Sequence, residues 1–360
     1  MAEKKRILVA PLNWGLGHAT RCIPIIQALL KYGFTPIIAS DGVALKLLQK
    51  EFPELESMEL PSYKITYAKK GKYFKFKLIM DSPKWLAAVK REKSEVRKLV
   101  RSGYIDGIIS DNRLGVFSKK VPSVFISHQL NVLSGNTSWF SSKMHQTIIK
   151  KFDECWVPDL EGEPNLSGKL GHLKNSKLNI KYLGPISRFK KVNCKPVFDL
   201  MVLLSGPEPQ RSFLEKKLLS ELEDYNGSVV FVKGVIEEKQ IKSVNDHMVI
   251  YNFMKSEQLE RTINQSKYVL SRSGYTTVLD LAKLEKKGFF IPTPGQYEQE
   301  YLAKRLDQLG LVPSCKQDDF ALQKLNGIEN YKGLTALNMD VNFKALFGLF
   351  KRKGKLAANA

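Results

Sequence analysis

Short apolar runs alternate with amphipathic stretches along most of the chain. The first half begins with RILVAPL, a helix-period segment at 18–31, TPIIAS and a second helical segment at 42–50, and it continues with DGIISD and PSVFIS. A second series starts at DLMVLLS and continues through SVVFVKG, HMVIYNF, KYVLSRSG and GFFIPTP. Alternation of this kind is typical of βαβ units around a parallel sheet. The pattern therefore predicts an α/β protein with two doubly wound domains.

The length of the chain supports this division. At 360 residues it exceeds what one core usually holds. The stretch GPISRFKKVNCKPVF, which begins at Gly184, is rich in Pro, Gly and Lys and lacks periodicity, so we predict an interdomain linker there. We expect an N-terminal domain at 1–188, a second domain at 189–330 and a basic helical tail at 331–360.

Charge adds a candidate surface. The chain has 57 Lys and Arg against 36 acidic residues, a formal net charge of +21, which favours an anionic partner. Nearly half of the excess lies at 64–101, where 13 basic and three acidic residues are interleaved with aromatic and aliphatic side chains. We predict that this segment docks on an anionic membrane surface. The alternative is a solvated basic loop and helix.

Two further features bear on partners. The C-terminal stretch VNFKALFGLFKRKGK places phenylalanines at helical spacing, either to join the membrane contact or to pack on the first domain. A basic nucleic-acid-binding protein is the non-enzymatic alternative, but no RRM, KH or helix-turn-helix signature accompanies the charge, so we expect no nucleic acid partner. The four cysteines form no metal-binding cluster, and no signal peptide or apolar run of 18 residues occurs. These features predict a cytoplasmic protein, peripheral on the inner face of the plasma membrane.

Candidate chemistry begins at the first turn, NWGLGHATR, between the first strand and the first helix. In a doubly wound sheet this turn faces the ligand crevice. Gly15 and Gly17 would let backbone N–H groups approach a ligand, and His18, a residue type that titrates near neutrality, would accept a proton from a hydroxyl nucleophile. The turn is neither a P-loop nor a complete GxGxxG fingerprint, since position 20 is Thr. A tight turn with a purely structural histidine is the alternative.

The second half carries a partner motif, SRSGYTTVLDLAKLEKKGFFIPTPGQYEQEYLAKRL. It resembles the nucleotide-sugar site of MurG-like glycosyltransferases of family 28, and LLSGPEPQR and SHQLNVLSGNTSWF resemble the family's glycine-serine turn and its His-Glu-Gln-Asn segment. The positions that match the motif are Arg272, Ser273, Gly274, Thr277, Asp280, Pro292, Gln299 and Glu300. The departures are Trp14 and Leu16 in the first turn, Thr20 and Arg21 after the histidine, and an aspartate at 280 in place of glutamate.

The resemblance implies a GT-B fold of two Rossmann-like domains facing a cleft. It implies an inverting, metal-independent transferase that moves a sugar from a UDP-linked donor to a hydroxyl acceptor, a lipid or lipid-linked glycan at the membrane surface, with no cofactor besides the donor. Domain closure about the linker at 184–196 would exclude water. A nucleotide-sugar 2-epimerase of the same fold is the alternative enzyme.

The resemblance also assigns roles to residues. His18 is the expected catalytic base. The expected donor-binding residues are Gly206, Arg272, Ser273, Gly274, Thr277, Asp280, Gln299 and Glu300, with Asp280 on the ribose hydroxyls. The expected acceptor-side residues are Gly15, Gly17, Arg21, Asp111, His128 and Asn131, and Asp111 could also orient His18. Purely structural readings compete with several of these: a surface arginine at 21, a turn-forming Asp111, an exposed Arg272, a solvated Asp280, and a Gln299 or Glu300 that simply faces solvent.

Overall fold

The computed structural model describes residues 4–63, 74–206, 208–245, 247–334 and 341–351, without the side chains of 74–83. The chain divides into two compact units. Unit 1 contains the described parts of Met1–Ile65, Leu78–Ile186 and Met339–Ala360, and unit 2 contains the described parts of Thr66–Lys77 and Ser187–Asn338. The chain passes from the first to the second between Ile186 and Ser187.

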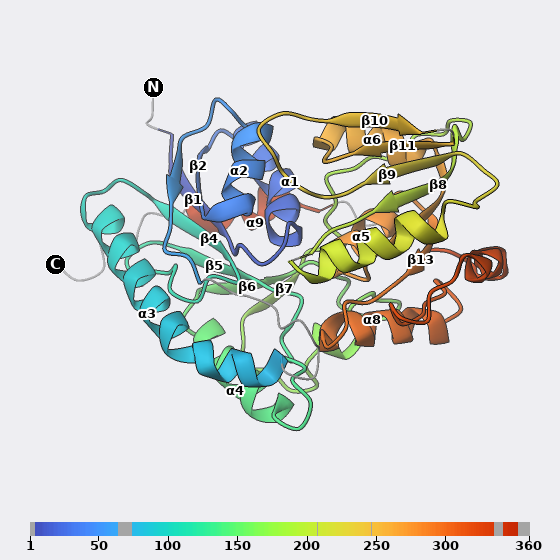
Figure 1. Ribbon diagram of the computed structural model, residues 1–360. Coiled ribbons are helices and arrows are strands. Elements are labelled where there is room, and N and C mark those ends of the chain that lie inside the picture. Colours follow the sequence, from blue (N-terminus) through green and yellow to red (C-terminus); the bar gives the residue numbers. More distant parts are fainter. Residues whose placement is uncertain (1–3, 64–73, 207, 246, 335–340, 352–360) are drawn as a thin grey trace. The chain divides into compact units, whose positions relative to one another are not determined.

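Unit 1 is built on a seven-stranded, all-parallel sheet with the order β3-β2-β1-β4-β5-β6-β7 (Figure 1). Its strands are β1 (Arg6–Pro11), β2 (Thr35–Ser40), β3 (Ser57–Glu59), β4 (Gly107–Asp111), β5 (Ser123–Ile126), β6 (Glu154–Val157) and β7 (Ile180–Tyr182). The apolar runs predicted as strands form the four adjacent strands β2, β1, β4 and β5. These strands are almost wholly buried because helices cover both faces of such a sheet. The strand order reverses at β1, next to β4, the position where ligands bind in this architecture.

The helices of unit 1 follow the predicted alternation. They are α1 (Gly17–Lys31), α2 (Gly42–Glu51), α3 (Phe74–Arg101), which belongs to this unit from Leu78 onward, and α4 (Ser138–Ile149), with a 3-10 turn η2 (Gly168–Leu170). The basic segment becomes α3 from residue 74 onward, and its part at 64–73 lies outside the described residues. No helix in the described ranges is long and apolar enough to cross a membrane.

The C-terminal segment packs into unit 1 as two short helices, α9 (Phe343–Leu346) and α10 (Gly348–Lys351). Phe347 and Phe350 are fully buried, with ring centroids 5.6 and 6.3 Å from that of Phe34. The ring of Phe350 also fills the space beside Gly107, where a Cβ would lie 2.5 Å from it. Of the two alternatives for these phenylalanines, packing on the first domain is therefore the one observed.

Unit 2 contains a six-stranded sheet with the order β10-β11-β9-β8-β12-β13, parallel except where β10 meets β11. Its strands are β8 (Phe198–Leu203), β9 (Val229–Val232), β10 (Lys242–Asn245), β11 (Met248–Tyr251), β12 (Ser266–Ser271) and β13 (Lys287–Phe290). Its helices are α5 (Gln210–Glu221), α6 (Ser256–Asn264), α7 (Tyr275–Lys283) and α8 (Tyr297–Gln308), followed by η3 (Leu322–Asn330). The predicted α/β class with two doubly wound domains is confirmed.

Candidate active site

The first turn of unit 1 brings the predicted base to the edge of the sheet. Gly15 has a φ of +76°, a conformation that favours glycine, and a Cβ added there would meet no atom within 4 Å. Helix α1 begins at Gly17, so His18 lies in its first turn, directly beyond the carboxyl end of β1. The turn therefore presents the open side of Gly15 and an imidazole at the ligand-facing edge of the sheet.

His18 meets Asp111, the last residue of the neighbouring strand β4. The Nδ1 atom of His18 lies 2.8 Å from Oδ1 of Asp111. The carboxylate is fully buried, whereas the imidazole remains 14% exposed. The two residues meet because Pro11, at the end of β1, is in register with Asp111 on β4. Asp111 is thus a partner of His18, and the alternative of a turn-forming Asp111 is wrong.

Arg21 completes this cluster from one turn further along α1. Its Nε and Nη2 atoms donate to the two oxygens of Asp111, and its Nη1 donates to Nδ1 of His128 over 2.9 Å. Its side chain is 1% exposed, so the alternative of a surface arginine is wrong. Burial alone would raise the pKa of Asp111, but the charge of Arg21 and the bond with His18 outweigh it and hold that pKa at about 2.

The bonds around Asp111 define the proton positions on His18. A guanidinium only donates, so the carboxylate accepts from Arg21 and still has capacity for a third donor. We assign that donor as Nδ1–H of His18, although Nη2 of Arg21 also lies 2.9 Å from this nitrogen. In this tautomer Nε2 carries no proton, and its lone pair is available as an acceptor. An imidazole held in this tautomer can accept a proton from a bound hydroxyl group.

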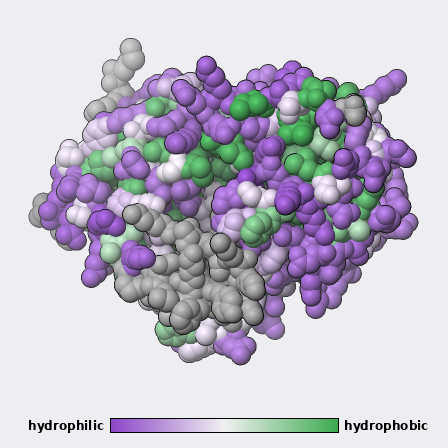
Figure 2. Space-filling view, in the orientation of Figure 1, coloured by the Kyte–Doolittle hydropathy of each residue, from purple (hydrophilic) through white to green (hydrophobic). Residues whose placement is uncertain are grey.

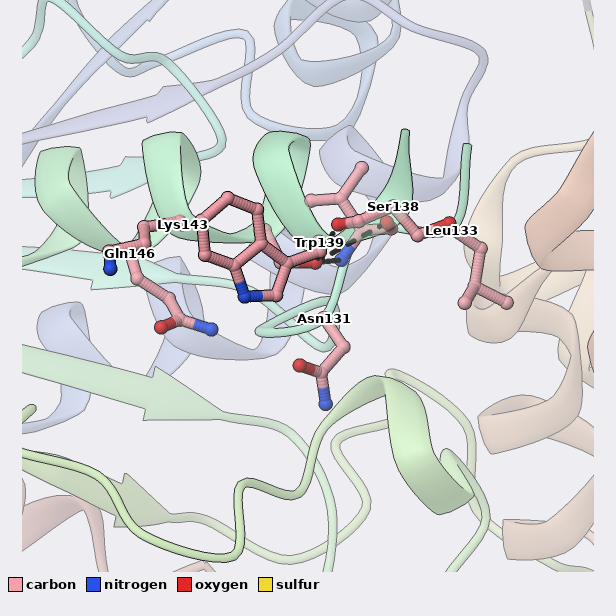
Figure 3. Close-up of a pocket in the computed structure, with 8 residues that line it drawn as sticks. Asn131, Leu133, Ser138, Trp139, Lys143 and Gln146 are labelled. Atoms are coloured by element: carbon pink, nitrogen blue, oxygen red, sulfur yellow. Dashed lines mark hydrogen bonds between the residues drawn. The ribbon is translucent and has the colours of Figure 1, made fainter. Parts of the chain in front are cut away.

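The side chain of Asn131 is bonded to the backbone of a neighbouring loop. Its Nδ2 donates to the backbone carbonyls of Lys169 and His172, over 2.6 and 3.1 Å. A cavity of about 340 Å³ lies next to it against α4 (Figure 3). The cavity is lined by Asn131, Val132, Leu133, Ser138, Trp139, Ser142, Lys143 and Gln146. The segment from Ser127 to Phe140 is the one that resembles the family's His-Glu-Gln-Asn segment. The structure adds Lys143 and Gln146, from the following helical turns, to the lining of the cavity.

The exposed side of α4 carries large apolar side chains. Trp139, Phe140 and Met144 are 73%, 65% and 55% exposed. Lys143 lies 5.1 Å from the centre of the Trp139 ring. In Figure 2 a small hydrophobic group lies at the lower edge of the face, in the region where Figure 1 draws α4, and other hydrophobic groups lie in the upper half. This group of three side chains and Lys143 is called the α4 patch below.

Unit 2 places two of its predicted donor-binding glycines at turns that precede helices. Gly206 follows β8 with a φ of +110°, and Gly274 is the N-cap of α7. A Cβ at either position would meet no atom within 4 Å, so both turns are open. Because its N-cap is a glycine, α7 has no capping side chain at that position. The first turn of a helix of this kind can receive an anionic group through its backbone N–H groups.

Arg272 and Ser273 lie beneath these turns and are engaged inside unit 2. Arg272 is 1% exposed, so an exposed arginine is ruled out. Its two Nη atoms donate to the carbonyls of Ile291, Pro292 and Gln210 and to Oε1 of Gln317, over 2.6 to 3.2 Å. Burial lowers the pKa of Arg272 to about 9. Ser273 donates to the carbonyl of Gln299 over 2.8 Å. Arg272 thus joins the loops around the predicted nucleotide site.

The remaining predicted donor residues lie on α7 and α8. Asp280 is 8% exposed, which contradicts the alternative of a solvated carboxylate, and it accepts a hydrogen bond from Ser187 over 2.6 Å. Gln299 accepts from the backbone N–H of Thr293, and Glu300 accepts from that of Gly295. These two side chains therefore shape the loop between β13 and α8. Thr277 lies half-buried on α7.

Comparison with known proteins shows that the chain is similar to glycosyltransferases. Residues 216–329 match the family described as glycosyltransferase family 28 C-terminal domain. The chain is 24% identical over 306 residues to the UDP-N-acetylglucosamine–N-acetylmuramyl-(pentapeptide) pyrophosphoryl-undecaprenol N-acetylglucosamine transferase of Clostridium perfringens, covering 80% of this chain and 78% of that protein. These similarities confirm the prediction of a MurG-like glycosyltransferase.

Solved structures of glycosyltransferases show the same fold as this chain. Acinetobacter baumannii MurG superposes with a TM-score of 0.53 and 13% identity over 92% of this chain and 93% of that one. Arabidopsis thaliana UGT89C1 complexed with quercetin superposes with a TM-score of 0.61 and 15% identity over 91% and 89%. The predicted GT-B fold is therefore confirmed. Since the protein is a glycosyltransferase, the alternative of a 2-epimerase is set aside.

A second buried cluster in the glycosyltransferase was not predicted. Arg113 is fully buried and pairs with Asp41, which follows β2, and with Glu92 of α3. Its Nε donates to the carbonyl of Pro11 over 2.9 Å, and Asp41 accepts from Asn13 of the first turn over 3.1 Å. The only sequence signal was a charged residue just beyond the ends of β2 and β4. The cluster holds the entry to the turn that carries His18.

One residue separates the two clusters. Asn112 has a φ of +58°, a left-handed conformation that asparagine tolerates better than most side chains. This turn at the end of β4 lets Asp111 reach His18 and Arg21 while Arg113 reaches Asp41 and Pro11. Within the described residues, no group of three or more His, Cys, Asp or Glu is arranged to hold a metal ion.

Proposed function

We propose that this glycosyltransferase moves a sugar from a UDP-linked donor to a hydroxyl group of a lipid or lipid-linked glycan, with inversion and without a metal ion. The observation that carries the proposal is the pair of His18 and Asp111 at the carboxyl edge of the unit 1 sheet, 2.8 Å apart. A single base beside the acceptor is what a one-step displacement at the anomeric carbon requires, and one displacement inverts the configuration.

In this proposal, Asp111 holds His18 and stabilises the imidazolium that forms. His18 accepts the acceptor proton at Nε2 as the hydroxyl oxygen bonds to the anomeric carbon and the bond to the diphosphate breaks. The buried carboxylate is kept ionised by Arg21, so it can stabilise the positive charge when it develops. Arg21 and His128 extend the same bonded set toward the acceptor side.

The donor would bind in unit 2. The turn at Gly206 and the N-terminus of α7 at Gly274 are open on the side that a Cβ would occupy, which suits the close approach of a diphosphate. Leaving-group charge would then be neutralised by backbone N–H groups and the helix dipole. Asp280 would accept the ribose hydroxyl groups, and Arg272 would hold the surrounding loops in place rather than contact the phosphates.

The α4 patch supports a lipid acceptor at a membrane surface. Tryptophan, phenylalanine and methionine side chains exposed to this degree favour the boundary between headgroups and acyl chains, and Lys143 can meet an anionic headgroup. The cavity beneath Trp139 lies on the same side of α4 as Asn131 (Figure 3). Cytoplasmic, peripheral attachment to the plasma membrane would bring the base to such an acceptor, with the basic helix α3 adding charge.

The test is a product assay with purified protein, a panel of UDP-sugars and undecaprenyl-linked or diacylglycerol acceptors in vesicles. We expect UDP release that needs one donor and one acceptor, persists in EDTA, and yields a product whose anomeric configuration by NMR is opposite to that of the donor. Retention of configuration or complete loss of activity in EDTA would overturn the mechanism. UDP release without acceptor would indicate hydrolysis, and conversion of the UDP-sugar into its epimer without acceptor would indicate an epimerase.

A further inference from the structure

The predicted linker at 184–196 is held by unit 2 over much of its length. Gly184 is still bonded within unit 1, since its N–H donates to the carbonyl of Asp159 over 3.0 Å. Beyond Ser187, the N–H of Lys190 donates to Glu260 of α6 over 2.7 Å. Residues 185 and 186 lie between Gly184 and Ser187. Because the residues that follow are bonded to α6 of unit 2, Ser187 has a defined position in that unit.

The direction of the hydrogen bonds at Ser187 follows from its neighbours. The backbone N–H of Phe189 donates to Oγ of Ser187 over 3.1 Å. The same Oγ lies 2.6 Å from Oδ1 of Asp280. Because the hydroxyl oxygen accepts from Phe189 and an ionised carboxylate can only accept, the hydroxyl proton is donated to Asp280. Ser187 thus fixes one oxygen of the carboxylate.

The other oxygen of Asp280 is not engaged by Ser187. Among the residues that the structure describes, Oδ2 has no hydrogen-bond partner, although the side chain is largely buried. Burial raises the pKa of Asp280 to about 6, while the nearby charge of Arg188 and the bond from Ser187 act in the opposite direction. Ser187 therefore both orients this carboxylate and favours its ionised form.

We propose that Ser187 is a positioning residue of the nucleotide site, which holds the Asp280 carboxylate so that its other oxygen receives a ribose hydroxyl of the nucleoside diphosphate. The inference rests on the proposed function of unit 2. A carboxylate that is already oriented loses little rotamer freedom when the ligand binds, so the hydroxyl of Ser187 contributes to affinity without touching the ligand. Because the effect passes through Asp280, it depends on the ribose hydroxyls.

Calorimetric titration with UDP and with 2′,3′-dideoxy-UDP tests this dependence. Ser187→Ala is expected to weaken UDP binding about tenfold, the loss that one charge-assisted hydrogen bond implies. Binding of the dideoxy compound is expected to stay unchanged, and Ser187→Thr, which keeps the hydroxyl, should restore UDP binding. Ser228→Ala is the matched control, because Ser228 donates to Asp199 over 2.9 Å elsewhere in unit 2.

A double-mutant cycle separates positioning from general damage to the fold. In the Asp280→Asn background, Ser187→Ala should add no further loss of UDP affinity. If UDP binds more tightly than the dideoxy compound but its affinity is the same for the wild type and Ser187→Ala, this inference is wrong and the proposed function stands. An equal loss for UDP and the dideoxy compound, or additive losses in the cycle, also overturns it. Failure of the wild type to bind UDP overturns the nucleotide assignment, and this inference with it.

Discussion

The Nδ1 atom of His18 lies 2.8 Å from Oδ1 of Asp111, across two adjacent parallel strands. The pair is built from the first helical turn after β1 and the last residue of β4, which are 93 residues apart in the chain. One member is fully buried and the other is partly exposed, so the carboxylate is shielded while the imidazole can reach a ligand.

Removal of the base tests this pair directly. His18→Ala is expected to lower kcat about 10²- to 10⁴-fold and to leave UDP affinity unchanged, because general-base catalysis acts on the transition state. Asp111→Asn should also lower kcat, since the amide neither stabilises an imidazolium nor fixes the tautomer. The measurement is steady-state UDP release over pH 5 to 9, with calorimetric UDP binding as the control. Normal turnover of His18→Ala at every pH would exclude the base assignment.

The buried ion pair between Arg21 and Asp111 should dominate the local stability of unit 1. Arg21→Met leaves the Asp111 carboxylate buried without its main partner, so we expect a loss of about 3 to 5 kcal/mol in the free energy of unfolding. Because the pKa of Asp111 is depressed in the folded state, its contribution is present above pH ~4 and lost as the pH falls toward 2. Urea unfolding at pH 7 and at lower pH measures both effects. Lys31→Met, which removes an exposed basic side chain from the same helix, is the matched control.

The pKa of Asp280 predicts a pH dependence of nucleotide binding. Burial raises this pKa to about 6, and ribose hydroxyls donate to the ionised carboxylate. UDP affinity should therefore fall as the pH drops through 6 and become about tenfold weaker at pH 5. Protonation of the diphosphate contributes separately, so the comparison is the ratio of wild-type to Asp280→Asn affinity at each pH. A ratio independent of pH would show that Asp280 does not contact the nucleotide.

The α4 patch makes a prediction for membranes. Trp139→Ala combined with Phe140→Ala should strongly reduce flotation with vesicles that contain anionic lipid, because these side chains would enter the interface. Thermal stability should not change, since both side chains are exposed. Val244→Ala, at a site 67% exposed in unit 2, is the control. Flotation of the double variant at wild-type levels would assign membrane binding elsewhere or exclude it.

The C-terminal phenylalanines should stabilise unit 1. Phe347→Ala is expected to cost about 3 to 5 kcal/mol, because the fully buried ring packs on Phe34 and Phe350 and its loss leaves a cavity. Chemical denaturation measures the change, and Lys344→Ala, at an exposed position of α9, is the control. An effect below 1 kcal/mol would show that the segment is not part of the core.

The sequence by itself determined the succession of strands and helices, the α/β class and the positions of the two glycine turns. Hydrophobic periodicity reports which face of each element is buried, and that information is local. Ordered motifs added the resemblance to MurG-like enzymes and thereby named His18 and Asp280. The same local reasoning left Arg21 as a surface residue in one reading, because an arginine on a helix is usually solvated.

Only the tertiary structure decided which buried polar groups meet. Arg21 is bonded to a carboxylate 90 residues away, and Ser187 to one 93 residues away. Strand order and register bring the ends of β1 and β4 together, and neither follows from the periodicity of a single segment. The Arg113 cluster was hidden for the same reason, and only the structure decided between the two alternatives for the C-terminal phenylalanines. A buried charge is stable only beside its partner, and the partner is chosen by the fold.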